Sequence, residues 1–196
     1  MKINPEKLKQ VVQKFKEAHK CNRVFLSGEE TFDQKYHSFR LSFLSQCGGV
    51  EEHGVLPIED DIVWEEGSAP SRVEIQKDDV IAVFDNTRIG WFGNVLKSDC
   101  EFGALITTKG IVTLNPHGEG CPSTSGIVSW RTLLIGNQSG IEYCSGADIY
   151  LYTNSDDSDA YPRGRAKALH FDQSKLEEND LYAFIRQIKS ILPVEG

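Results

Sequence analysis

Short runs of β-branched and aromatic residues follow one another from residue 72 to residue 171, and they constrain the fold more than any other feature of this sequence. Glycine, asparagine, aspartate and serine separate the runs at the close spacing of antiparallel sheets. In the turn Thr108-Lys109-Gly110 the glycine can supply a positive φ, so residues 102–115 form the clearest hairpin. The expected strands are residues 72–75, 80–85, 102–107, 110–115, 127–130, 133–135, 140–144, 147–152 and 166–171.

A helix is expected on each side of these strands. Asn4 and Pro5 suit a helix start, and apolar residues recur at helical spacing to about residue 20, with lysines on the other face. Asp172 or Ser174 can cap a second helix, which Pro193 ends. We expect the apolar stripe of the first helix to dock on the protein itself. The stripe of the second helix comprises Leu181, Phe184, Ile185, Ile188, Ile191 and Leu192.

The segment between the first helix and the strands is less regular. Residues 29–46 fit a helix, although Phe39, Leu41 and Phe43 also alternate as in a strand. We expect a helix because the longer pattern is more informative. Residues 50–70 combine acids, proline and glycine, which is typical of a connector. The helical face would comprise Phe32, Tyr36, Phe39, Phe43 and Leu44.

The fold class expected from these patterns is α+β. Residues 1–70 would form an N-terminal helical extension with an acidic connector. Residues 71–196 would form an antiparallel β-barrel or sandwich closed by the C-terminal helix.

Composition and charge exclude several classes of protein. The 196 residues include 21 Lys and Arg against 29 Asp and Glu, a formal charge of −8, which argues against bulk attraction to nucleic acid. No apolar run reaches the roughly 20 residues that span a bilayer, and residues 1–10 lack the apolar core of a signal peptide. These features predict a cytoplasmic protein of bacterial type.

Three stretches, residues 79–87, 102–111 and 127–130, carry a resemblance to a known family. The first stretch has an acid followed by an apolar strand that ends in D-x-T. After a variable loop, the second stretch reads G-x-x-x-T-x-K-G followed by an apolar residue. The third stretch contains an apolar residue, a serine and an aromatic residue in succession. The pattern resembles bacterial pleckstrin-homology-like (PH-like) domains, and the resemblance covers about residues 71–193. It implies two sheets forming a half-open barrel, plugged at one end by the C-terminal helix. It also implies a binding or scaffolding module that is mainly non-catalytic.

The loop after the first strand of that pattern is the first candidate binding surface. Lipid-binding relatives place a basic cluster there, whereas this loop offers only Arg88 and Lys97, so phosphoinositide binding is not expected. Trp91 and Phe92, flanked by glycines, either project as an aromatic anchor for a partner or fold back as a lid over the barrel mouth.

A basic run on or beside the last expected strand is the second candidate surface. Arg163, Arg165, Lys167 and His170 could receive a phosphate or an acidic peptide, or could blunt the edge of a sheet. The partner we expect is another protein or a peptide. The predicted binding residues are therefore Arg88, Trp91, Phe92, Arg163, Arg165 and Lys167.

The motifs of familiar enzymes are missing from the sequence. It has no phosphate-binding glycine loop, zinc-protease helix motif or nucleophile elbow. Residues 154–159 begin like a calcium loop, but Arg165 stands where the bidentate glutamate would be. Five widely spread cysteines without a C-x-x-C pair indicate reduced, packed thiols. We therefore predict a non-enzymatic interaction module without a metal or cofactor.

Two alternatives stay open. Cys121 and His117 lie four residues apart in a glycine-rich segment and could form a Cys–His catalytic pair, with Glu119 or Asp99 orienting the imidazole. The basic helix at residues 5–20 could instead hold the protein on a membrane surface as a peripheral adaptor.

Overall fold

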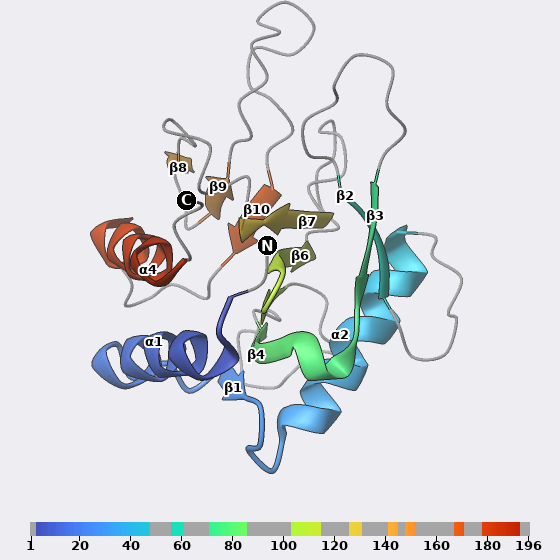
Figure 1. Ribbon diagram of the computed structural model, residues 1–196, viewed down its shortest axis with the longest axis horizontal. Helices are drawn as coiled ribbons and strands as arrows, with labels where there is room; N and C mark the ends of the chain where they lie inside the picture. Colours follow the sequence, from blue (N-terminus) through green and yellow to red (C-terminus); the bar gives the residue numbers. More distant parts are fainter. Residues whose placement is uncertain are drawn as a thin grey trace, which may run out of the picture.

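The computed structural model describes residues 3–47, 56–60, 71–85, 103–114, 126–130, 141–144, 148–151, 167–170 and 178–192 (Figure 1). These residues form a mixed α+β structure, as the sequence predicts. The helices are α1 (Pro5–Ala18), α2 (Phe32–Cys47), the short 3₁₀ helix η1 (Lys77–Asp79) and α4 (Glu178–Ile191). The strands are β1 (Val24–Leu26), β2 (Leu56–Asp60), β3 (Ser71–Ile75), β4 (Val80–Asp85), β5 (Gly103–Thr107), β6 (Gly110–Leu114), β7 (Gly126–Ser129), β8 (Ile141–Cys144), β9 (Asp148–Leu151) and β10 (Lys167–His170).

All strand pairs described are antiparallel, and they form three sheets. The largest sheet has the order β1-β4-β5-β6-β7, the second has the order β10-β9-β8, and β2 pairs with β3. β10 also lies against β5 and β6, so the two larger sheets are in contact. Within the described residues these sheets do not close into a barrel.

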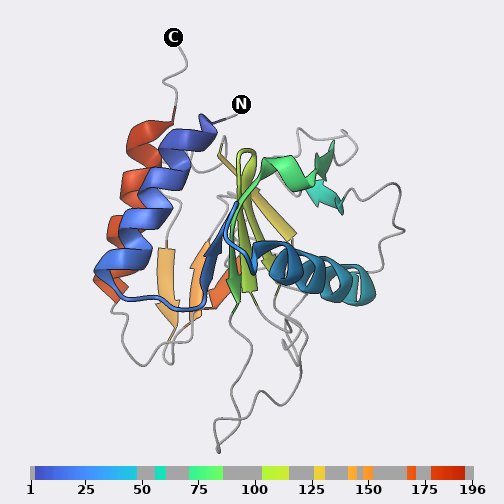
Figure 2. The same cartoon turned by 90° about the horizontal axis from the view of Figure 1, so that it is seen from below.

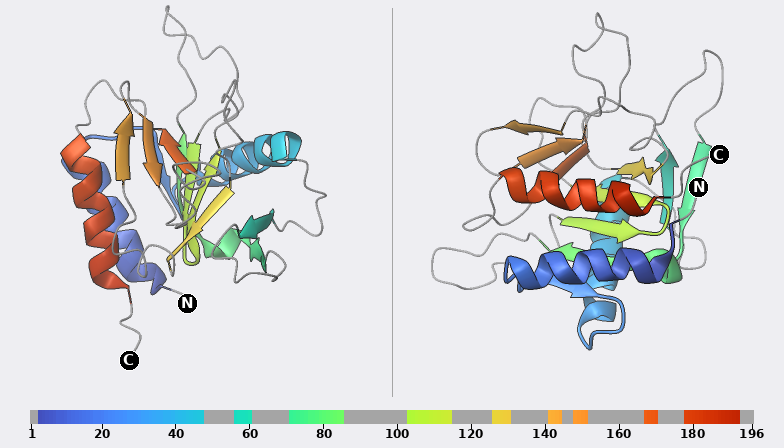
Figure 3. Two further views of the ribbon diagram at one scale, coloured as in Figure 1. Left: turned by 90° about the horizontal axis from the view of Figure 1, so that it is seen from above. Right: turned by 60° about the vertical axis from the view of Figure 1, so that its left-hand side comes forward.

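The five-stranded sheet lies between helices on both of its faces. Figure 2 shows α1 and α4 side by side on one face and α2 on the other, and Figure 3 shows the same arrangement from two further directions. Two buried apolar clusters correspond to these faces. Leu8, Val12, Phe15, Phe184 and Ile188 pack on the α1/α4 face, whereas Phe32, Tyr36, Phe39 and Phe43 pack on the α2 face.

β4 is buried along its whole length because helices cover both faces of the sheet. The pairing with β5 shifts between Val80 and Ala82, which is the mark of a β-bulge. The bulge breaks the usual alternation of side chains. Ile81 and Ala82 therefore both belong to the α1/α4 core, while Val80 and Val83 belong to the α2 core.

Three phenylalanines join α1, β4 and α4 on the first face. The ring centroids of Phe15 and Phe184 lie 4.4 Å apart, those of Phe84 and Phe184 6.1 Å apart, and those of Phe15 and Phe84 6.3 Å apart. These spacings fall within the range of favourable aromatic pairs. The triangle therefore ties the first and last helices of the chain to the central strand.

The three expected helices are confirmed. The Lys7 backbone N–H donates to Asn4 Oδ1 over 3.1 Å, as expected of a helix cap, and Leu8, Val12 and Phe15 of α1 are buried. Residues 29–46, which also fitted a strand, contain most of α2. The last helix covers Glu178–Ile191, and its proposed caps Asp172 and Ser174 lie outside the described residues.

The expected strands are confirmed within a residue or two at their ends, apart from residues 133–135, which lie outside the described part of the chain. Two strands were missed. β1 has three residues, too few for an alternating pattern, and it forms only by pairing with β4. Residues 56–60, expected as part of a connector, form β2 and pair with β3. Pro57 argued against a strand here, because proline has no backbone N–H and is tolerated only at strand positions that need not donate a hydrogen bond.

Within the described residues the expected barrel is not closed. The C-terminal helix was expected to plug one end of a barrel, yet α4 lies beside α1 and packs on the α1/α4 face of an open sheet. The apolar stripe of α1 explains the difference, since it gives α4 a helical neighbour to pack against. The division of the chain at residue 70 stays a prediction, and the pairing of β1 with β4 crosses it.

Replacing Phe184 by alanine tests the aromatic triangle. Phe184 is 2% exposed, so Phe184→Ala should lower the free energy of unfolding by about 3–5 kcal/mol through lost burial and the cavity it leaves. Urea denaturation measures the change. Leu41→Ala, at a side chain 48% exposed, is the control and should cost less than about 0.5 kcal/mol. Equal losses in the two variants would show that the triangle does not stabilise the fold.

Candidate functional site

The end of β4 holds a buried carboxylate beside the loop that carries predicted binding residues. Asp85 is 3% exposed and is the last residue of β4. It is the register partner of Gly103, the first residue of β5. Residues 86–102 therefore leave and rejoin the sheet at neighbouring positions, and Arg88, Trp91 and Phe92 belong to this connection.

Two cations neutralise the Asp85 carboxylate. Arg23 Nη2 lies 3.3 Å from Oδ1, and Lys35 Nζ lies 2.6 Å from Oδ2. The Asp85 backbone N–H also donates to the Arg23 carbonyl over 3.0 Å. Lys35 comes from α2 and lies 5.3 Å from the centroid of the Phe25 ring in β1. This Asp85 cluster (Arg23, Lys35 and Asp85) thus joins β1, α2 and the end of β4.

A second buried carboxylate, Asp79, lies at the start of β4. Thr108 Oγ1 donates to Asp79 Oδ1 over 3.0 Å, and Lys109 Nζ lies 2.8 Å from Oδ2. The Thr108 backbone N–H donates to the Asp79 carbonyl over 2.8 Å. The acid and the T-x-K-G residues of the sequence pattern are therefore in direct contact, and they fasten the β5–β6 turn to η1.

Thr107 and Trp130 complete this turn. Thr107 Oγ1 donates to the Gly110 carbonyl over 2.7 Å, and the indole Nε1–H of the buried Trp130 donates to the Thr107 carbonyl over 2.9 Å. The Trp130 backbone N–H donates to the Lys109 carbonyl over 3.1 Å. The residues that carry the family resemblance thus satisfy one another's hydrogen bonds, so their role here is to hold the hairpin.

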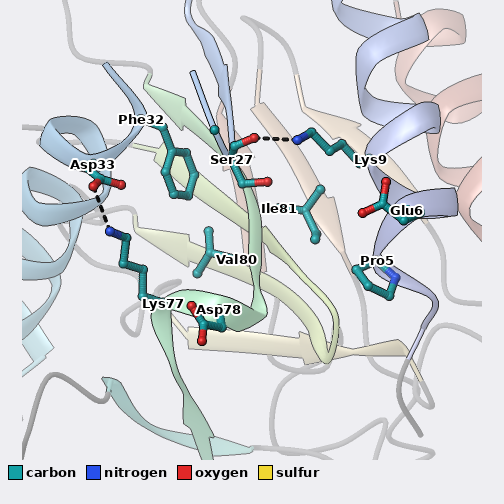
Figure 4. Close-up of a pocket in the computed structure, with 11 residues that line it drawn as sticks. Pro5, Glu6, Lys9, Ser27, Phe32, Asp33, Lys77, Asp78, Val80 and Ile81 are labelled. Atoms are coloured by element: carbon teal, nitrogen blue, oxygen red, sulfur yellow. Dashed lines mark hydrogen bonds and ion pairs between the residues drawn. The ribbon is translucent and has the colours of Figure 1, made fainter. Parts of the chain in front are cut away.

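An open cavity of about 410 Å³ lies between the first turn of α1, the turn after β1, the start of α2, and η1; we name it the α1–η1 cavity. Phe32, Val80 and Ile81 give it an apolar floor. Figure 4 shows its two lysines on opposite sides of Val80 and Ile81. Lys9 Nζ donates to the Ser27 carbonyl over 2.6 Å, and Lys77 Nζ lies 2.8 Å from Asp33 Oδ2.

The predicted binding residues fall mostly outside the part of the chain that the structure describes. Five of them lie outside the described ranges: Arg88, Trp91, Phe92, Arg163 and Arg165. Whether they share one surface is therefore still a prediction from the sequence. Lys167 begins β10 and is the register partner of Leu151 in β9. β10 stands at the end of the order β10-β9-β8 and also lies against β5 and β6, so the alternative that its positive charges blunt a sheet edge stays a prediction.

The residues of the catalytic alternative also lie outside the described ranges, as do residues 154–159 of the calcium-like stretch. His117, Cys121, Glu119 and Asp99 therefore remain candidates from the sequence alone. Within the described ranges, no group of three His, Cys, Asp or Glu side chains could hold a metal ion.

Cys21 is a free, partly buried thiol that packs beside the α1/α4 core. Burial raises its pKa, and the negative charge of Asp180 raises it further. A raised pKa lowers the thiolate fraction near neutral pH, and the thiolate is the reactive form. Cys21 is therefore a packed thiol of the kind expected from the sequence.

Sequence reasoning missed the Asp85 cluster and the α1–η1 cavity. Arg23, Lys35 and Asp85 are widely separated along the chain, and only the pairing of β1 with β4 and the packing of α2 bring them together. Lys9 and Lys77 likewise line one cavity although they are far apart in the sequence. For the cavity alone, the sequence offers one signal, the contrast between the basic residues 1–24 and the acidic residues 50–79.

Comparisons with protein-family models, with curated proteins and with solved structures found no match to this chain.

Replacing Asp85 by asparagine tests whether its charge holds the end of β4. Asp85→Asn keeps the shape but leaves two cations facing a neutral amide, so the free energy of unfolding should fall by about 3–5 kcal/mol. Urea denaturation measures the loss. Asp33→Asn is the matched control, because its carboxylate is 70% exposed and its pair with Lys77 should contribute about 0–1 kcal/mol. A loss no greater than that of the control would show that the Asp85 pairs add little.

Proposed function

We propose that this protein is a non-enzymatic module that binds another protein or a peptide through the loop containing Arg88, Trp91 and Phe92. The observation that carries the proposal is the fixed base of that loop. Asp85 and Gly103 are register partners in the central sheet, and Asp85 is buried between Arg23 and Lys35. Binding loops gain precision when a rigid scaffold holds their ends.

The order of the strands supports a PH-like domain as the finer description of the fold. β4 to β7 are consecutive neighbours in one sheet, β8 to β10 are consecutive neighbours in a second sheet, and α4 follows them. Two antiparallel sheets followed by a helix is the order that the sequence resemblance implies. The elements β1, α1 and α2 are additions to this order. We propose that they stabilise the sheets and do not contact the partner.

Trp91 and Phe92 are the residues we expect to carry most of the binding energy. Tryptophan is enriched among residues that dominate interfaces, and the remaining loop charges are too few to hold a phosphorylated lipid headgroup. Arg163 and Arg165, which precede β10 in the sequence, and Lys167, its first residue, form the second proposed contact, for an acidic segment of the partner. A cytoplasmic location is part of this proposal.

The structure gives a specific argument against the membrane alternative. Leu8, Val12 and Phe15, the apolar face of α1, are buried in the protein core. An amphipathic helix binds a bilayer by burying that face in the lipid. In the described part of the chain, moreover, no helix combines the length and the apolar character needed to cross a membrane. Only the lysine face of α1 is left for a lipid surface.

The double variant Trp91→Ala/Phe92→Ala tests the proposed loop. Affinity capture with the wild-type and variant proteins, followed by quantitative mass spectrometry, should show a partner whose recovery falls about tenfold or more, as expected when a dominant interface residue is lost. The melting temperature should stay unchanged. Leu41→Ala, at an exposed side chain of α2, is the control and should capture as much as the wild type. Unchanged capture, or a collapse of thermal stability, would overturn the proposal.

Liposome flotation tests the membrane alternative. Vesicles rich in anionic phospholipid should not carry the full chain upward at physiological salt, since the apolar face of α1 is already buried and exposed charges are screened. A synthetic peptide of residues 3–20, whose apolar face is free, provides the positive control. Flotation of the intact protein with the vesicles would favour the peripheral adaptor instead.

A further inference from the structure

We propose that the α1–η1 cavity binds an alkylammonium cation: the side chain of a lysine on another protein, or the end of a polyamine. The cavity's volume of about 410 Å³ lies within the roughly 300–1,000 Å³ typical of ligand pockets. All of its lining residues belong to the described part of the chain. The lining of the cavity includes none of the residues of the proposed loop, so each proposal has its own test.

The charges of the cavity favour a cation. Its two lysines are already occupied, Lys9 by the Ser27 carbonyl and Lys77 by the Asp33 carboxylate. The carboxylates of Glu6 and Asp78 also line the cavity and make no hydrogen bond or ion pair with any described residue. Glu6 lies in the first turn of α1, where its negative charge stabilises the positive end of the helix dipole. That interaction does not use up the carboxylate oxygens, which can still accept hydrogen bonds from a ligand. The Ser27 carbonyl is neutral, so Lys9 keeps its positive charge; with Glu6, Asp33 and Asp78 against Lys9 and Lys77, the lining still carries a net formal charge of −1.

The shape of the cavity favours a cation on an aliphatic stem. Phe32, Val80 and Ile81 are buried side chains at its floor, between the two lysine contacts (Figure 4). Long charged side chains bury their methylene groups on such surfaces while the charged end stays near solvent or a partner. An ammonium group on a four-carbon chain could thus place its methylenes over Val80 and Ile81 and its charge near Glu6 or Asp78.

A divalent metal is a weaker fit to the same residues. Metal sites in proteins draw several carboxylate or imidazole ligands together around one point. Within the described residues no three such side chains do so. The occupant that matches both the separated carboxylates and the apolar floor is therefore an organic cation.

An NMR titration of the full chain provides the direct test, with n-butylammonium chloride as the probe and n-butanol as its neutral counterpart. We expect saturable shifts of the backbone amides of Ser27, Gly28 and Asp78 with millimolar affinity for the amine, and weaker binding of the alcohol. The affinity should also fall as salt is added. Equal binding of the alcohol, or shifts spread over acidic residues far from the cavity, would overturn the proposal.

Substitutions at the carboxylates give the second test. Glu6→Gln and Asp78→Asn should each weaken butylammonium binding about fivefold, the effect of an exposed ion pair of about 1 kcal/mol. Glu30→Gln is the matched control, an exposed acid outside the cavity. An equal loss in the control would show that the probe responds only to overall charge.

Removing a lysine should have the opposite effect. Lys77→Gln frees the Asp33 carboxylate, which Lys77 now holds at 2.8 Å, and should strengthen amine binding several-fold. Lys14→Gln changes the net charge by the same amount on an exposed part of α1 outside the cavity, and should have little effect. Equal gains in both variants, or no gain in Lys77→Gln, would contradict the assignment.

The two sources of the cation are distinguished by comparing N-acetyl-lysine methylamide with spermidine in the same titration. Tighter binding of the lysine derivative would identify a protein side chain as the ligand, and tighter binding of spermidine would identify a polyamine. Absence of binding for both compounds and for butylammonium would overturn the proposal.

Discussion

The structure depends on the burial of β4 and β5 from both sides. Every residue of these two strands is buried, since α1 and α4 cover one face of the sheet and α2 covers the other. Burying a large aliphatic or aromatic side chain contributes about 1.5–3 kcal/mol. The three helices and the short strand β1 thus depend on one central pair of strands, β4 and β5, for the surface against which they pack.

Burial on both faces also explains the placement of the buried charges. β4 begins just after Asp79 and ends at Asp85, and both carboxylates are almost wholly removed from water. A buried carboxylate is costly unless it is paired and hydrogen-bonded. Lys109 and Thr108 meet this need at one end, and Arg23 and Lys35 meet it at the other. The ends of the central strand are consequently fixed. The connection that contains the proposed loop follows Asp85 in the sequence, and Val80 and Ile81 of β4 line the α1–η1 cavity.

The sequence predicted the elements with strong local patterns. The cap at Asn4 follows from capping chemistry, and the stripe of α4 and the paired strands β5 and β6 follow from periodicity. The positive φ expected at Gly110 is not found; among the described residues only Lys20 and Gly28 have one. It missed β1, which has only three residues, and β2, whose proline and acids resemble a loop. It also gave no indication of the Asp85 cluster, because the spacing of Arg23, Lys35 and Asp85 along the chain has no period to detect.

The sequence by itself determined the three α-helices and the described strands from β3 to β10, since hydrophobic periodicity and capping act between residues that are close along the chain. Tertiary structure alone decided that α4 lies beside α1, that β1 joins the central sheet, and that Glu6, Lys77 and Asp78 surround one cavity. The physical reason is that an apolar stripe specifies that a face must be buried but does not specify the surface that buries it. Packing of the whole chain makes that choice, and it brings distant charges together as a result.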